Sequence, residues 1–276
     1  MMNFATCQGL PPSINYLSSN CEDIFDNFGN AQIISSGTKG TIFKVHNKLI
    51  NTDTAIKIQL FDENALNELI VGCTLNSLPT DCFVKYTIWF VCKSLPEWGI
   101  SDTLQISETR NYLFIEMNKV EISIETLVFI NASLDIFALL SILFEIIYAL
   151  YLARKAFLFS HNDLHANNIL IQQLDDYTSQ SYMVNNTKFT LERKYIPIII
   201  DYDNATMNRD LSSTDTKNLY LTFSFLLNNV KGMGPHQRNL YLNILDQHLN
   251  KITSPTDTKS LETALLSDIF SGFIDE

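Results

Sequence analysis

The chain has 276 residues, of which 46% are hydrophobic and 18% are charged, which is an ordinary balance for a folded globular protein. The formal net charge of −11 disfavours nucleic acid and anionic membranes as partners and favours basic proteins, although such a charge also serves solubility alone. No basic segment followed by an apolar core opens the sequence, so we do not expect a secretory signal.

The cysteines bear on the cellular compartment. Five of them, an odd number without a CxxC pair or a nearby histidine pattern, argue against a structural zinc site and against a complete disulfide framework. We therefore expect reduced thiols in a nuclear or cytoplasmic protein. The glycosylation sequons at Asn131, Asn185 and Asn204 would then be chance matches.

The first part of the chain is predicted to be rich in β-strands. Residues 1–30 have no regular pattern and are predicted to be an irregular extension. Short runs rich in β-branched and aromatic residues follow, and a helix is indicated by apolar residues at helical spacing. The expected strands are 31–34, 41–45, 54–58, 83–91 and 112–117, and the expected helix is 62–78.

The second part is predicted to be mainly helical, with a boundary near Asn118. Its longest apolar stretch, 134–159, contains Asp135 and Glu145 and has Arg154 and Lys155 near its end, so it cannot offer about 20 uncharged residues to a bilayer. We expect a buried helix there. Short strands are expected at 168–171 and 196–200, with a hairpin over 182–191 that turns at Asn185-Asn186, and helices over 215–273. The sequence therefore predicts an α+β fold with a β-rich lobe (31–118) and a helical lobe (119–276).

The strongest chemical motif is His161-Asn-Asp-Leu-His-Ala-Asn-Asn168. An Asp followed five residues later by an Asn, before a short apolar strand, is typical of the catalytic loop of kinases. Phosphoryl transfer needs a carboxylate to orient the acceptor hydroxyl, which Asp163 can supply, and oxygen ligands for Mg²⁺, which Asn168 can supply. Asp201 follows a second apolar strand, where kinases place another magnesium ligand. Asp163 and Asn168 could instead simply cap turns of a polar loop.

A lysine upstream completes the pattern. Lys57 lies in a predicted strand beyond Gly37 and Gly40, where it could neutralise the α- and β-phosphates of ATP. Glu68 on the following helix is its expected partner, with Glu63 as the alternative. We thus predict catalytic roles for Asp163, Lys57, Asn168, Glu68 and His165, metal binding by Asn168 and Asp201, and ATP binding by Gly37, Thr38, Gly40, Ile42, Ala55, Lys57, Glu116, Met117, Asn168 and Asp201.

Several details make the chain resemble the haspin family of serine/threonine protein kinases, over most of its length. His165 follows the Asp163-Leu164 pair, Tyr202 follows Asp201, and an insert with a hairpin separates the two motifs. The segment Cys7-Gln-Gly-Leu-Pro-Pro is also similar. The resemblance implies a two-lobed, Mg²⁺- and ATP-dependent protein kinase that acts in the nucleus on a threonine of the histone H3 tail, and we expect a monomer.

Some positions depart from that pattern and leave alternatives open. Asn162 replaces the Arg that normally precedes the catalytic Asp, and Asp203 stands where haspins have Thr. The interval from Asp201 to Asp215, the residue expected to brace the catalytic loop, is only 14 positions and has no Ala-Pro-Glu motif. A small-molecule kinase of the choline or aminoglycoside type, an atypical kinase of the RIO type and an inactive binding module are the competing interpretations.

Overall fold

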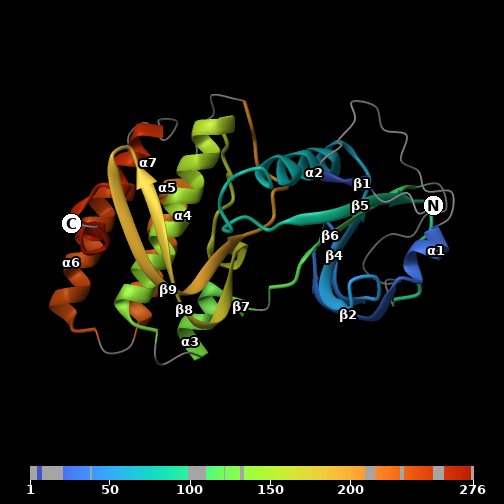
Figure 1. Ribbon diagram of the computed structural model, residues 1–276, viewed down its shortest axis with the longest axis horizontal. Coiled ribbons are helices and arrows are strands. Elements are labelled where there is room, and N and C mark those ends of the chain that lie inside the picture. The colour runs from blue at the N-terminus through green and yellow to red at the C-terminus, as the bar shows by residue number, and fades with distance from the viewer. Residues whose placement is uncertain are drawn as a thin grey trace. The chain divides into compact units, whose positions relative to one another are not determined.

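The computed structural model describes the chain except residues 1–4, 8–20, 38, 99–109, 121, 131–133, 209–214, 231–232, 251–257 and 275–276. The chain divides into two compact units. Unit 1 comprises Met1–Ser77 and Val84–Lys119, and unit 2 comprises Leu78–Phe83 and Val120–Glu276. The fold is α+β, with an antiparallel sheet in unit 1 and several helices in unit 2 (Figure 1).

Unit 1 is built on a six-stranded antiparallel sheet in the order β1-β5-β6-β4-β3-β2. Its helices are α1 (Cys21–Phe25) and α2 (Glu63–Leu75), and Asp62 caps α2 by accepting a hydrogen bond from the backbone N–H of Ala65 at 2.9 Å. The strands are β1 (Ala5–Thr6), β2 (Phe28–Ser36), β3 (Thr41–Asn47), β4 (Thr52–Leu60), β5 (Tyr86–Cys92) and β6 (Tyr112–Asn118).

The segment before residue 31 is more regular than predicted. Residues 1–30 were expected to be irregular, yet α1 lies there and β2 begins at Phe28. The side chains of Ile24 and Phe28 are buried in the core on one face of the sheet, together with Phe43, Ile56 and Phe114. A five-residue helix has too few residues to show a periodic pattern, and its stability comes from this tertiary burial.

The cysteine prediction was wrong. Disulfides join Cys7 to Cys73 and Cys21 to Cys92, so that the N-terminal segment is linked to α2 and to β5. The partners are 66 and 71 positions apart in sequence, and only the folded sheet brings them together. The odd cysteine, Cys82, is free and buried, and burial raises the pKa of its thiol. Spacing alone therefore could not show the pairing.

The two disulfides should stabilise unit 1 against unfolding. Replacing Cys7 and Cys73 together with Ser should lower the free energy of unfolding by about 2–4 kcal/mol, because the unfolded chain regains the freedom of a long loop. Urea unfolding of the variant and the parent protein measures this difference. Maleimide labelling in denaturant should modify Cys82 alone without reductant, and labelling of every cysteine under those conditions would contradict the pairing.

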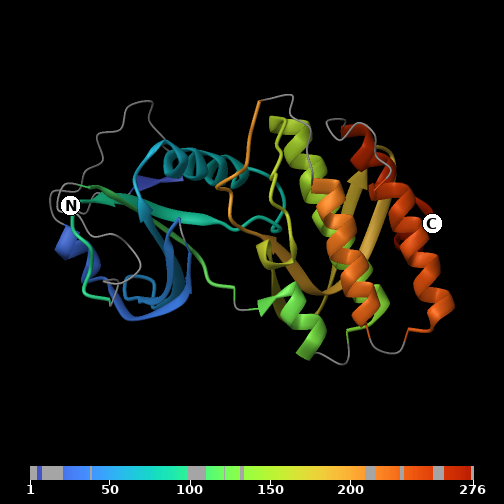
Figure 2. The same ribbon diagram turned by 180° about the vertical axis from the view of Figure 1, so that it is seen from behind.

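Unit 2 combines helices with a three-stranded antiparallel sheet in the order β7-β8-β9. The helices α5 and α6 lie next to each other, orange and orange-red in Figure 2. The strands are β7 (Ile122–Ser123), β8 (Ile169–Val184) and β9 (Thr187–Ile199), and the α-helices are α3 (Ile124–Ile130), α4 (Ile136–Phe157), α5 (Asp215–Asn229), α6 (Pro235–Leu245) and α7 (Thr258–Leu265). Shorter helical segments are η2 (Ala166–Asn168), η3 (Asp246–Asn250) and η4 (Asp268–Phe273).

The helix expected from the 134–159 stretch is confirmed as α4. It packs against β9 and α7 (Figure 1). By length and composition alone α4 could cross a membrane, but 72% of its most apolar window is buried inside the protein, as in the core helix of a soluble protein. Glu145 on this helix is buried and hydrogen-bonded to Tyr182 and Arg193.

The hairpin turn at Asn185-Asn186 is confirmed, since Val184 pairs with Thr187 across it. The strands that flank it are much longer than predicted. The short strands expected at 168–171 and 196–200 are the outer ends of β8 and β9, which continue to the turn with a register shift between Gln173 and Thr178. Exposed polar residues in the middle of β8 hide the strand pattern, because buried residues lie only near its two ends, at Ile169 and Ile171 and at Tyr182 and Val184.

Candidate functional site

The centre of the unit 1 site is a buried ion pair. The Nζ atom of Lys57 on β4 lies 2.8 Å from Oε1 of Glu68 on α2, which confirms the predicted pair. Glu68 is fully buried, whereas Glu63, the alternative partner, is exposed. Removing two charges from water costs free energy that their mutual attraction can fail to return, so a buried ion pair contributes little to the stability of the fold. Its presence therefore indicates a functional role for the lysine.

Two side chains that the sequence did not reveal hold Glu68 in place. The amide Nε2 of Gln59 donates to Oε2 of Glu68 at 2.7 Å, and the hydroxyl of Tyr86 donates to Oε1 at 3.0 Å. Gly72 on α2 permits the close approach of the Tyr86 ring, because a Cβ there would lie 2.2 Å from a ring carbon. Gln59 is two residues beyond Lys57, so strand alternation could have suggested its role, but nothing local points to Tyr86.

The strand register places other predicted ATP-binding residues around Lys57. Ile42 pairs directly with Lys57, and Ala55 pairs with Met117, so these four side chains share one face of the sheet. The glycine turn is closed by a hydrogen bond from the Gly37 N–H to the Gly40 carbonyl at 3.0 Å. A Cβ on Gly40 would lie 2.6 Å from the carbonyl oxygen of Ile58, so only glycine fits there. Thr38 lies outside the described residues.

Glu116 differs from the other predicted ATP-binding residues. It pairs with Ile56, so its side chain lies on the face opposite Lys57. Its Oε1 accepts hydrogen bonds from Asn47 Nδ2 and Thr54 Oγ1, both at 2.7 Å, and Oε2 accepts one from Thr87 Oγ1 at 3.2 Å. The carboxylate therefore ties neighbouring strands together, and only the backbone of Glu116 could serve a ligand on the Lys57 face.

In unit 2, Asp215 at the start of α5 braces the loop that carries Asp163, as the sequence indicated. Its two carboxylate oxygens accept hydrogen bonds from the backbone N–H groups of His161 (2.9 Å) and Asn162 (2.8 Å). Arg154 lies 3.8 Å from Asp215. Burial lowers the pKa of the Arg154 guanidinium, while the charge of Asp215 opposes that shift. The loop backbone is thus fixed by a buried carboxylate.

Three of the predicted catalytic residues, Asp163, His165 and Asn168, lie together on this loop. The carboxylate of Asp163 is partly exposed, and its Oδ1 is 3.8 Å from Nε2 of His165, which is beyond hydrogen-bonding distance. Asn168 donates from Nδ2 to the carbonyl oxygen of Asp163 at 2.9 Å. This bond orients the amide of Asn168, and its oxygen remains as the atom that could bind a metal.

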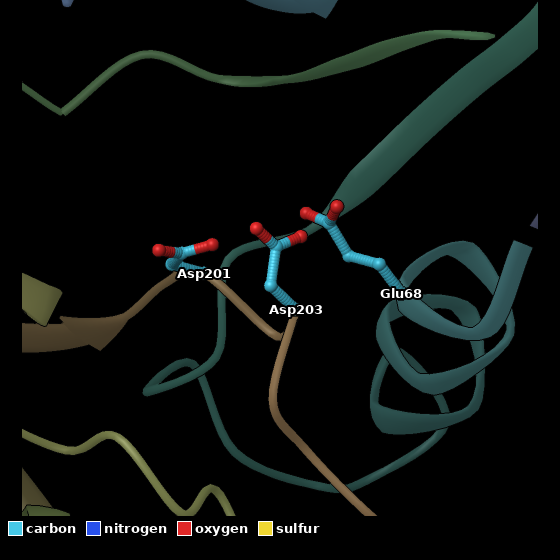
Figure 3. Close-up of side chains that lie close together, drawn as sticks. All are labelled: Glu68, Asp201 and Asp203. Atoms are coloured by element: carbon cyan, nitrogen blue, oxygen red, sulfur yellow. The ribbon is translucent and has the colours of Figure 1, made fainter. Parts of the chain in front are cut away.

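The sheet of unit 2 places Asp201 at the same end as Asn168. Ile169 pairs with Ile199, and the N–H of Ile200 donates to the carbonyl of Asn168 at 3.1 Å. The φ angle of Asp201 is 65°, in the left-handed region, so the chain turns sharply there. Figure 3 shows Asp201 and Asp203 projecting from the segment after β9. One carboxylate oxygen of Asp201 and one of Asp203 lie within 4.8 Å of each other.

The donor set of unit 2 fits a magnesium ion. Asn168 and Asp201 offer the amide and carboxylate oxygens that Mg²⁺ prefers, and Asp203 adds a further carboxylate. Zinc, in contrast, is usually bound by nitrogen and sulfur ligands from His and Cys. The residues could therefore hold Mg²⁺ against a phosphate group.

Asparagine side chains that the sequence analysis did not assign also contact the loop. Asn162 donates from Nδ2 to the carbonyl of Asn204 at 3.0 Å and to the hydroxyl of Thr206 at 3.1 Å. Asn204 in turn places its Nδ2 3.4 Å from Oδ2 of Asp163. The available signal in the sequence was an asparagine directly before Asp163, a residue type that tolerates the positive φ of 65° found there.

The comparisons with known proteins do not identify a family. No protein-family model matches the chain, and no curated protein is similar enough to count as a relative.

Proposed function

We propose that the chain is an ATP-dependent phosphotransferase of the two-lobed protein-kinase type that acts on a serine or threonine of a protein. The observation that carries the proposal is the buried ion pair of Lys57 with Glu68. The order of the motifs alone predicted this pair, and kinases use such a pair to hold the lysine that contacts the phosphates of ATP. Unit 2 supports the proposal with Asp163, Asn168 and Asp201.

Each residue has a defined role in this reaction. Bound Mg²⁺, held by Asn168 and Asp201, would neutralise charge on the phosphates. Lys57 pairs with the α- and β-phosphates. Asp163 accepts a hydrogen bond from the acceptor hydroxyl and takes its proton as the oxygen bonds to the γ-phosphorus. The bond from that phosphorus to the bridging oxygen breaks, and ADP leaves.

The proposed substrate follows from the net charge of the chain and from its resemblance to haspins. A net charge of −11 favours a basic protein, and the similarity to haspins suggests a threonine in a histone H3 tail in the nucleus. Disulfides are more typical of proteins in oxidising compartments than of nuclear or cytoplasmic proteins. The two disulfides therefore favour a basic protein substrate outside the nucleus and the cytoplasm. We propose a monomer as the acting species.

Asn162 favours a second candidate function. Choline and aminoglycoside kinases often have Asn or Gly before the catalytic Asp, and they share a short segment after the metal-binding Asp, as here from Asp201 to Asp215. A small-molecule kinase, or an atypical protein kinase of the RIO type, is therefore the alternative.

One experiment separates these functions. The full chain, purified without reductant, is incubated with Mg²⁺ and labelled ATP and with one acceptor at a time: a histone H3 peptide, a generic basic protein, choline and an aminoglycoside. We expect label on a protein or peptide, and none with the Lys57→Met variant. Label on a small molecule alone would favour the alternative, and no transfer to any acceptor or to the chain itself would contradict a kinase function.

A further inference from the structure

The segment that follows Asp201 is tied to the catalytic loop without any modified residue. Ser160 and Thr206 exchange both backbone hydrogen bonds, at 3.0 and 2.8 Å, and the N–H of Asn208 donates to the carbonyl of Phe157 at 3.0 Å. The side chain of Asn162 adds its two bonds to Asn204 and Thr206. The chain from Asn204 to Asn208 is therefore held against the loop that carries Asp163 and the segment just before it.

A continuous series of contacts leads from α5 to the Asp163 carboxylate. Asp215 accepts from the backbone of Asn162, which fixes the position of that residue. Asn162 then holds the carbonyl of Asn204, and the amide of Asn204 faces Oδ2 of Asp163 at 3.4 Å. A donor beside a carboxylate stabilises one rotamer of that carboxylate, and a charged acceptor strengthens the bond. The other oxygen, Oδ1, lies on the side of His165.

We propose that Asn204 is a positioning residue for Asp163: its amide holds Oδ2, so that Oδ1 is presented to the hydroxyl of the acceptor, and Asn162 acts through Asn204. This inference rests on the proposed phosphotransfer function. In this arrangement the orientation of Asp163 depends on two neutral amides in the chain itself, so it needs no phosphorylated residue in the segment after Asp201.

The test compares three variants of Asn204 with a matched control in the full chain. Asn204→Leu removes the donor and keeps the branched shape of the side chain, and kcat should fall roughly tenfold or more with little change in the KM for ATP, because the alignment of Asp163 is lost. Asn204→Gln keeps an amide and should recover most of the rate. Asn186→Leu, at the exposed hairpin turn of the same unit, should leave kcat unchanged.

A charged variant separates positioning from a merely structural role. Asn204→Asp places a second carboxylate beside Asp163, so kcat should fall below that of Asn204→Leu. This additional loss should shrink between about 0.01 M and 1 M salt, since salt screens exposed charges. A structural defect at Asn204 would give the same loss at every ionic strength, and that result would overturn the proposal.

A spectroscopic arm makes the proposal independent of activity. The side-chain amide signal of Asn204 in the nitrogen-15 NMR spectrum, identified by its loss in Asn204→Leu, should move in the Asp163→Asn variant, while the Asn186 signal stays. An unmoved Asn204 signal, or a kcat unchanged in Asn204→Leu, would overturn the proposal. A moved signal in a chain that transfers no phosphate would support the contact and contradict the proposed function instead.

Discussion

Replacing Asp163 with Asn is expected to abolish phosphate transfer and to leave ATP binding nearly unchanged. The carboxylate faces the acceptor hydroxyl in the proposed reaction, so its charge matters mainly when that oxygen attacks. An amide of the same shape keeps the loop packing, because the contacts from Asn168 go to the backbone carbonyl of Asp163. The rate should fall by about 10³-fold or more, as for the loss of a residue that acts in the transition state.

The matched comparison is Asp201→Asn. Asp201 is proposed to bind Mg²⁺, which neutralises the phosphates before and during transfer, so its loss should weaken Mg²⁺-dependent ATP binding as well as turnover. Calorimetric titration of ATP with and without Mg²⁺, alongside the transfer assay, distinguishes the two variants. Full activity of Asp163→Asn would contradict the assignment of the catalytic loop, and with it the proposed function.

The sequence revealed the parts of the fold and site whose signal is local. Lys57 and Glu68 could be paired in advance because a strand followed at once by a helix leaves few choices of partner for the lysine. The turn at Asn185-Asn186 was predictable because its residues tolerate positive φ, and Asn185 indeed has a φ of 53°. Local chemistry of this kind needs no knowledge of the rest of the chain.

Other features depend on residues far apart in sequence, and the sequence could not show them. Tyr86 meets Glu68 only because Gly72 lets its ring approach α2, and no spacing encodes that contact. The pairing of Cys21 with Cys92 depends on how the sheet folds. Asn204 was interpreted only as a chance sequon, since its amide finds Asp163 through a turn of the backbone at Asp201.

The core helix α4 shows how unit 2 accommodates a buried charge. Glu145 accepts a hydrogen bond from Nη1 of Arg193 at 2.9 Å and another from the hydroxyl of Tyr182. Burial raises the pKa of the Glu145 carboxyl, and these two hydrogen bonds oppose that shift. Other buried positions on α4 carry apolar residues. Leu139, Ile142 and Ile146 are examples, and all three are almost completely buried.

Replacing Ile142 with Asp should therefore unfold unit 2. Ile142 has no exposed surface; Leu139 and Ile146 beside it on the helix are apolar, and Glu145, three residues after it, is itself acidic, so none of them offers the new carboxylate a donor. A buried charge without a partner costs several kcal/mol, against a total stability of about 5–15 kcal/mol for an ordinary domain.

The matched control is Phe137→Asp on the same helix, because Phe137 is 64% exposed and lies in the first turn, where a negative charge suits the helix dipole. Thermal unfolding followed by circular dichroism should show the cooperative transition in the control and its loss in Ile142→Asp. Equal melting of the two variants would mean that α4 is not the core of unit 2.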